Sequence, residues 1–333
     1  MNHCFFIFFL IILSYATQAT LVKIYQVPLN LQQEVYLLGD RHNTIKSIKA
    51  EQEQVNFFKD LCNQAKSKAL SCKIVIERPT PLVKILDPSP RVLADLGIDV
   101  ISDSSLSIQD GEIRCYSMAA YYLLRRSSPT SMLISDEYTL GGISCNVTTL
   151  TYHDVYQEYM HYTTLLSTLY NKLDNVLAQK LVSEKLHESQ KAVALLQAQL
   201  EGLLLAVNDT VQSSIDHLYT TYPQTAAKIC ATLAQRIYKI SAPLFELALL
   251  YSIIANKDTQ KIIIATGSLH TNELLSCLYK LGYSVKHIFG DKDDLLPLQQ
   301  EDLQNFSYQF FKDRVVYKDT SLFKILLAYC KLT

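Results

Sequence analysis

Two runs of β-branched residues constrain the fold of this 333-residue chain more than any other feature. Residues 74–76 and 261–266 are mostly apolar, whereas a half-exposed strand alternates polar and apolar side chains. Such continuous runs are typical of strands buried on both faces of a parallel sheet. Stretches with helical spacing separate them from further strand candidates, at residues 21–25, 35–38, 100–101, 132–134 and 284–288. This alternation predicts an α/β fold with a mostly parallel central sheet flanked by helices.

The middle of the chain is expected to be entirely helical. Residues 143–201 contain neither glycine nor proline, and their apolar residues recur at spacings of three, four or seven. Further helices are expected over residues 183–207, 211–222, 223–239 and 242–255, with Pro223 in a first turn. The chain thus divides into four segments: a signal peptide (1–19), the first half of an α/β core (20–140), a large all-helical insertion (141–257) and the second half of the core (258–333).

The N-terminus carries an apolar run over residues 5–13, followed by small residues up to Ala19. A membrane-spanning helix needs about 20 apolar residues, so this shorter run indicates a secretory signal cleaved after Ala16 or Ala19. We therefore expect an exported protein, periplasmic or secreted, with no stable membrane span after cleavage. No lysine or arginine precedes the run. An uncleaved N-terminal anchor and a buried first strand are the alternatives.

Charge and cysteine content exclude several classes of function. The formal net charge is −1 and the longest basic cluster is Arg125-Arg126, so no basic surface for nucleic acid is expected. Seven cysteines follow the signal, irregularly spaced and without a Cys-x-x-Cys pair. This pattern fits neither a disulfide framework nor a zinc ribbon. Several cysteines should pack as small hydrophobic residues, and whether one or two pairs are oxidised is left open.

Two Gly-x-x-His sequences follow strong strand candidates: Gly39-Asp40-Arg41-His42 and Gly267-Ser268-Leu269-His270. Glu77 follows a third strand, and the carboxyl ends of parallel strands meet at one edge of a sheet. We therefore expect His42, Glu77 and His270 to converge there. Two imidazoles and a carboxylate can hold a divalent metal with an open position, or activate water without metal. Each copy alone is weak evidence, since a histidine at a strand end is often structural.

Other polar residues are weaker candidates for the site. Arg41 and Arg78 could hold an anionic group or form surface ion pairs. Glu246, in an apolar helical stretch, points either into the site or to the surface. Asp103, Asp136, Glu137 and His287 lie near strand ends, where solvated positions are the usual outcome. Four histidines lie on polar helices and are expected at the surface: His153, His161, His187 and His217.

The two Gly-x-x-His sequences and Ile76-Glu77-Arg78-Pro79 between them resemble the signature of the TraB/Tiki/erythromycin-esterase-like superfamily. The resemblance implies His42, Glu77 and His270 as the central trio. Asp40 stands where the esterase branch has glutamate, and Arg114 is similar to an arginine often found at the site. The superfamily includes metal-dependent proteases, lactone hydrolases that use histidine-activated water, and proteins that bind or shut down peptide pheromones.

The resemblance thus implies a hydrolase of a peptide or ester bond, metal-dependent or metal-free, and the N-terminal signal implies its export. Its substrate would be a small molecule or peptide, and a metal cofactor, where one is used, would be a divalent ion of unknown identity. The alternative is a non-catalytic binding or regulatory protein that uses the same pocket. No Walker loop, Gly-x-Gly-x-x-Gly or Gly-x-Ser-x-Gly sequence occurs, so nucleotide-dependent and serine-hydrolase chemistry have no support.

Overall fold

A mixed six-stranded sheet forms the centre of the protein, in the order β4-β3-β7-β2-β1-β8. In this computed structural model we describe residues 19–30, 33–42, 48–77, 106–125, 137–140, 143–173, 175–256, 258–290 and 298–318. The neighbours β4, β3, β7 and β2 pair in parallel, while β1 is antiparallel to both β2 and β8. The α/β prediction is confirmed. The strands are β1 (Ala19–Pro28), β2 (Glu34–His42), β3 (Cys72–Ile76), β4 (Leu106–Asp110), β7 (Lys261–Gly267) and β8 (His287–Gly290).

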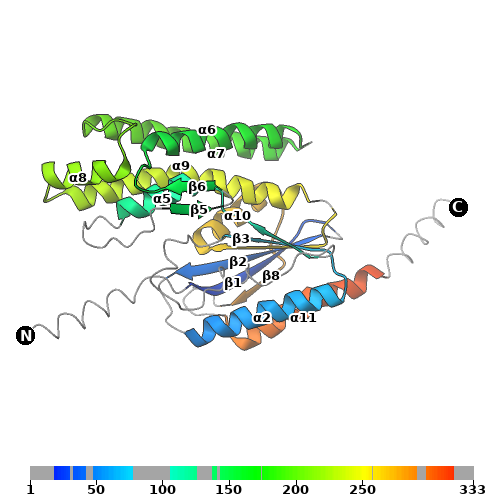
Figure 1. Cartoon of the computed structure of the whole chain (residues 1–333). Coiled ribbons are helices and arrows are strands. Elements are labelled where there is room, and N and C mark those ends of the chain that lie inside the picture. The colour runs from blue at the N-terminus through cyan, green and yellow to red at the C-terminus, as the bar shows by residue number, and fades with distance from the viewer. Residues whose placement is uncertain are drawn as a thin grey trace, which may run out of the picture.

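Helices cover both faces of this sheet, because the side chains of its central strands alternate between two apolar layers. Tyr36 and Leu38 of β2 pack in the layer that contains α2 (Ile48–Ser67) and α11 (Gln300–Lys318). Val35 and Leu37 point the other way, into the layer of α9 (Ala226–Ile254) and α10 (Ser268–Lys280). Figure 1 shows α2 and α11 together below the sheet, with α9 and α10 on its other side. Burial on both faces explains the continuous apolar runs of β3 and β7.

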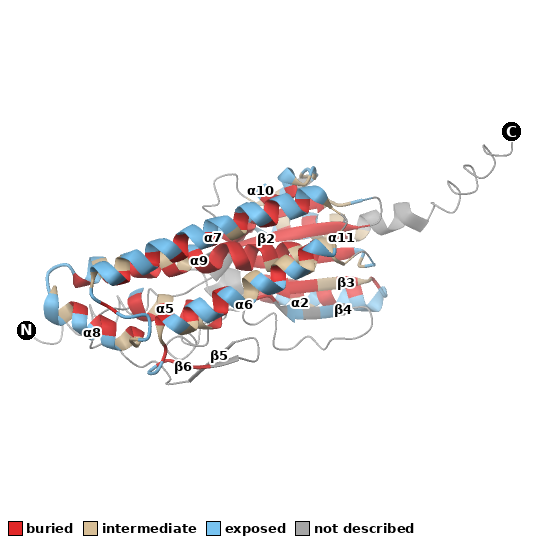
Figure 2. Ribbon diagram, turned by 90° about the horizontal axis from the view of Figure 1, so that it is seen from above, coloured by how far each residue is buried: buried red, intermediate tan, exposed pale blue. Residues whose placement is uncertain are grey.

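A helical block lies above the sheet in Figure 1, on the face opposite α2 and α11. It is built from α6 (Tyr152–Asn171), α7 (Val176–Gly202), α8 (Val211–Thr221) and α9, with α5 (Cys115–Arg125) packed against it. Its longest element, α9, belongs to both the block and the sheet layer. Figure 2 shows α9 buried along most of its length while α6 and α7 expose their outer faces. Among the described helices, α9 alone is long and apolar enough to cross a membrane, and 67% of its most apolar window is buried inside the protein.

Several predicted elements need correction. The strands β5 (Glu137–Leu140) and β6 (Ile143–Asn146) form a hairpin, so the helical region begins at Tyr152 rather than near residue 143. The two helices expected over residues 223–255 are one helix that continues through Pro243 and starts at Ala226, which places Pro223 outside its first turn. Burial of α9 on several sides stabilises the helix where proline removes a backbone hydrogen bond.

The remaining differences lie at element ends and in elements that the sequence pattern did not reveal. β8 begins at His287 instead of residue 284, and α7 spans Val176–Gly202 instead of residues 183–207. The exposed edge strand β4 and the helix α11 were not expected. Gly282 does end α10, with φ +90° and a Schellman pair of hydrogen bonds in which Gly282 N–H and Tyr283 N–H donate to Tyr279 and Leu278.

Three predicted segments cannot be compared with the structure, whereas the prediction for the cysteines can. The apolar run at 5–13 and the strand candidates at 100–101 and 132–134 lie outside the described residues. The six described cysteines are all buried, as expected of small hydrophobic residues.

Candidate functional site

Charged side chains gather at the carboxyl edge of the sheet, where β3, β4 and β7 end. Glu77 directly follows β3, and its backbone N–H donates to Ala265 O of β7 (2.8 Å). Glu112 and Arg114 lie between the end of β4 and the start of α5, and His270 is in the first turn of α10. Glu246 reaches the same place from α9. Parallel pairing of the three strands brings these segments together although they are far apart in the sequence.

Arg114 is the centre of the cluster and is only 1% exposed. Its Nε and Nη2 donate to the two carboxylate oxygens of Glu112, at 2.7 and 2.6 Å. Nη2 also donates to Glu77 Oε1 (2.9 Å), and Nη1 lies 3.2 Å from His270 Nε2. The guanidinium stacks 4.0 Å from the ring centroid of Phe245. Burial by itself lowers the pKa of Arg114, but the two carboxylates outweigh burial and raise it.

Glu77 connects Arg114 to the end of β7. Its Oε2 accepts the backbone N–H of Gly267 (2.8 Å) and the hydroxyl of Thr266. Burial raises the pKa of Glu77, yet the neighbouring His270 and Arg114 side chains and these two hydrogen bonds hold it at about 2. Glu77 is therefore a carboxylate at any physiological pH, with both oxygens engaged.

His270 is held at both ring nitrogens and is 5% exposed. Nδ1 lies 3.2 Å from Glu246 Oε1, while Nε2 faces the Tyr238 hydroxyl (3.3 Å) and Arg114 Nη1 (3.2 Å). A guanidinium can only donate hydrogen bonds, so Nε2 must be the acceptor and Nδ1 carries the hydrogen. Burial raises the pKa of Tyr238 to about 12, so its phenol also remains a donor. This geometry assigns the Nδ1–H tautomer to His270.

The first Gly-x-x-His sequence lies within its strand instead of following it, which corrects the sequence interpretation. Residues 39–42 remain in β2, and Asp40 pairs with Gly267 in the parallel register. In the second copy, Ser268 to His270 already belong to α10. Neither Gly39 nor Gly267 has positive φ, since among described glycines only Gly282 and Gly290 do. The two sequences therefore lie side by side with different backbones.

Five of the predicted site residues have described side chains, namely Asp40, Glu77, Arg114, Glu246 and His270. Glu77, Arg114, Glu246 and His270 are in direct contact, while Asp40 is buried (1% exposed) one strand away. The side chains of Arg41 and His42 lie outside the described residues, as do Arg78, Asp103 and Asp136 and the side chains of Glu137 and His287. The four helix histidines, His153, His161, His187 and His217, are exposed, as expected.

Three contributors were missed by the sequence analysis. Glu112 follows β4, an edge strand whose Ser107 and Gln109 are exposed and which therefore lacks the apolar run of β3. Tyr238 precedes Glu246 by eight residues on α9, a spacing that places both near one helix face. Lys185 of α7 contacts Glu246 (2.9 Å). No sequence pattern near Lys185 indicates this contact, because Glu246 lies on a separate helix.

The described donors do not fit a divalent metal. Glu77 Oε1 and His270 Nε2, the atoms that would ligate one, both contact the Arg114 guanidinium. A cation already bridges two of the three expected ligands, and a second cation there would be repelled. Within the described parts of the chain, no three His, Cys, Asp or Glu side chains are grouped for a metal.

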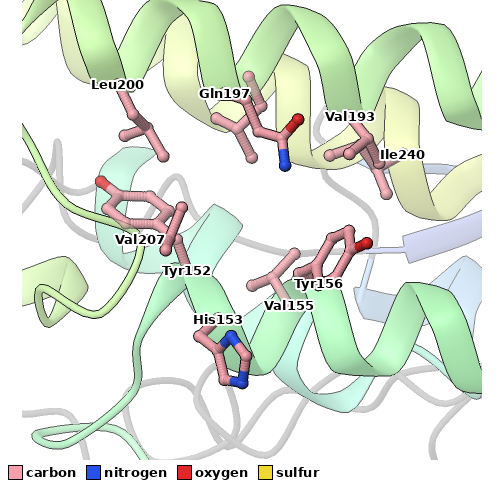
Figure 3. A pocket seen from close by; sticks show the side chains of 10 residues that line it. Tyr152, His153, Val155, Tyr156, Val193, Gln197, Leu200, Val207 and Ile240 are labelled. Atoms are coloured by element: carbon pink, nitrogen blue, oxygen red, sulfur yellow. The ribbon is translucent and has the colours of Figure 1, made fainter.

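A cavity of about 200 Å³ lies elsewhere, between α6, α7 and α9 (Figure 3). Tyr152 and Tyr156 of α6 face Val193 and Leu200 of α7 across it, and Ile240 of α9 also lines it. None of the charged residues around His270 contributes to its wall. The cavity is thus separate from the candidate site.

Comparison with protein-family models, curated proteins and solved structures found no match to the chain. The resemblance to the TraB/Tiki/erythromycin-esterase-like superfamily accordingly stays a prediction that rests on short motifs.

Proposed function

We propose that the chain is an exported hydrolase of a peptide or ester bond, in which His270 activates water without a metal. The single observation that carries the proposal is the environment of His270, whose Nδ1 faces a carboxylate while its Nε2 faces a guanidinium and a phenol. An imidazole oriented by a carboxylate is the usual general base of acyl-transfer enzymes. Export is supported by the apolar run at residues 5–13.

The site offers a base and a charge stabiliser next to each other. A substrate carbonyl oxygen would replace Nε2 as the acceptor of the Arg114 Nη1–H. The freed Nε2 would take a proton from water as the water oxygen bonds to the carbonyl carbon. Arg114 would stabilise the oxyanion that develops, and His270 would return the proton to the leaving group. The substrate would bind at the carboxyl edge of the four strands that pair in parallel, β2, β7, β3 and β4.

Substitution of His270 tests the proposal. His270→Gln should lower turnover of activated esters or fluorogenic peptides by about 10²–10⁴-fold, the range for loss of a general base. Glu246→Gln should lower it less, since the amide still accepts from Nδ1–H. His153→Gln is the matched control, because His153 is exposed on α6. Full activity of folded His270→Gln would refute the catalytic role.

Burial of the cluster supports a second candidate, a non-catalytic binding or regulatory protein that uses the same residues. Arg114 is 1% exposed and His270 5%, and Glu77 has a side-chain exposure of only 15%. A closed cluster of this kind can bind one carboxylate or carbonyl group without turning over a substrate. Absence of turnover across a broad ester and peptide panel, together with saturable peptide binding that Arg114→Met abolishes, would favour this candidate.

A further inference from the structure

Lys185 of α7 is a buried lysine, 6% exposed, surrounded by carboxylates. Its Nζ lies 2.9 Å from Glu246 Oε2, 3.1 Å from Glu273 Oε2 and 3.8 Å from Glu188 Oε2. Glu273 and Glu188 are largely exposed, with side-chain exposures of 53% and 59%, whereas Glu246 is 6% exposed. The Glu246 contact is therefore the one that water screens least.

Glu246 uses its two oxygens for two different partners. Oε2 accepts from Lys185, and Oε1 lies 3.2 Å from His270 Nδ1. A carboxylate without a second partner could rotate and offer either oxygen, at a range of angles, to the imidazole. With Oε2 held by an ammonium, Oε1 has one orientation toward His270.

We infer that Lys185 is a positioning residue for His270: by holding Glu246 Oε2 it keeps Oε1 as the acceptor of Nδ1–H, so that bare Nε2 faces Arg114 and Tyr238. Lys185 lies on α7, Glu246 on α9 and His270 on α10, so the connection runs from the helical block to the sheet edge. The role of Lys185 in orienting His270 stands without the proposed function. Only the step in which Nε2 acts as a general base rests on that proposal.

The ion pairs around the ring agree with this role. Glu246 bridges Lys185 and the Nδ1 side of His270, while Glu77 and Glu112 pair with Arg114 at the Nε2 side. Removal of Lys185 would leave Glu246 as a buried carboxylate without its cation, and either of its oxygens could then turn toward the imidazole.

The test is the ¹⁵N spectrum of the His270 ring in the full chain at neutral pH, assigned by loss of the signals in His270→Gln. Ring ¹⁵N shifts distinguish the Nδ1–H tautomer, the Nε2–H tautomer and the imidazolium. The wild type should give the Nδ1–H pattern. Lys185→Met should give a mixture of tautomers or the imidazolium, and Lys185→Arg should restore the wild-type pattern.

The control is Lys280→Met, on the same helix as His270. Lys280 forms a half-exposed ion pair with Glu184 (3.4 Å), and its loss should leave the His270 signals unchanged. Folding of each variant is checked by circular dichroism and by the remaining histidine signals. A folded Lys185→Met protein with the wild-type ring pattern overturns the inference, and so does a wild type that lacks the Nδ1–H pattern.

Activity data separate this inference from the hydrolase proposal. If no substrate is turned over while the ring spectra change as described, the positioning role stands and the hydrolase proposal fails. If turnover is found and Lys185→Met leaves both kcat and the spectra unchanged, only the positioning role fails.

Discussion

Nη1 of Arg114 lies 3.2 Å from Nε2 of His270, so a guanidinium contacts the nitrogen that would bind a metal or a water proton. The same guanidinium reaches Glu77 and Glu112. This contact disfavours a metal at the cluster, because two of the expected metal ligands, Glu77 and His270, are already partners of an arginine. It also ties three strand ends to one side chain, and stability and function should respond together when it is changed.

Substitution of Arg114 should destabilise the protein strongly. Arg114→Met leaves Glu112 and Glu77 as buried carboxylates without their cation, a loss of about 3–5 kcal/mol in unfolding free energy. Arg114→Lys should be intermediate, because one ammonium cannot serve Glu112, Glu77 and His270 at once. Urea titration measures both. Arg125→Met, at the exposed end of α5, is the control and should stay within about 0.5 kcal/mol of wild type. Equal effects at the two positions would contradict the buried network.

Glu77 should make the fold sensitive to acid. Its pKa is held near 2 in the folded protein against an ordinary value of 4.5, so its contribution is fully present above about pH 4.5 and is lost as the pH falls toward 2. The shift corresponds to at most about 3 kcal/mol. Unfolding free energies of wild type and Glu77→Gln should therefore differ most above pH 5 and converge near pH 2. Parallel pH curves would show that Glu77 is not held ionised by its neighbours.

Glu158 should make the protein less stable as the pH rises, which is the opposite of the effect of Glu77. It lies on α6 and accepts the N–H groups of Tyr116 (2.8 Å) and Ser117 (3.0 Å) at the start of α5. Burial nevertheless raises its pKa to about 7 from an ordinary 4.5. Because its folded pKa is raised, the contribution of Glu158 to stability is fully present below about pH 4.5 and is lost as the pH rises through 7.

Glu158→Gln should remove this decline, because the amide does not ionise. The measurement is unfolding free energy between pH 5 and 8. Glu188→Gln, at an exposed position on α7, is the control that should keep the wild-type slope. A slope that survives in Glu158→Gln would assign the pH dependence to another group.

Gly111 should tolerate no side chain. A Cβ there would lie 2.7 Å from Val75 Cγ1 and 2.9 Å from Leu249 Cδ2, between β3 and α9. Gly111→Ala should cost about 1–3 kcal/mol through overpacking, and it should also displace Glu112, the next residue. Gly202→Ala is the matched control at the end of α7, where no atom lies within 4 Å of the added carbon. Thermal unfolding should show a loss for the first variant and no loss for the second.

Chelation should leave the protein unchanged. Because Arg114 already occupies Glu77 and His270, purified protein should contain substoichiometric metal by elemental analysis. EDTA should alter neither turnover nor melting temperature. Stoichiometric zinc or manganese that is lost on chelation together with activity would reverse this expectation and would point to His42 as a further ligand.

The sequence by itself determined the main strands and the position of Glu77. The apolar runs at residues 74–76 and 261–266 predict β3 and β7, because strands covered on both faces have no polar face to display. The carboxyl ends of parallel strands lie at the same edge of the sheet, so residues just after each strand can be placed there from the sequence. Glu77 and His270 follow this rule.

Only the tertiary structure decided what these residues contact and how the first Gly-x-x-His sequence is folded. Residues 39–42 stay extended because β2 pairs with β1 on one side, through His42, and with β7 on the other, through Asp40. No sequence pattern within residues 39–42 predicts that pairing, because its partners lie far away in the chain. Likewise Glu246, Tyr238 and Lys185 reach His270 only because α9 and α7 pack where they do, and such packing depends on contacts between residues far apart in the chain.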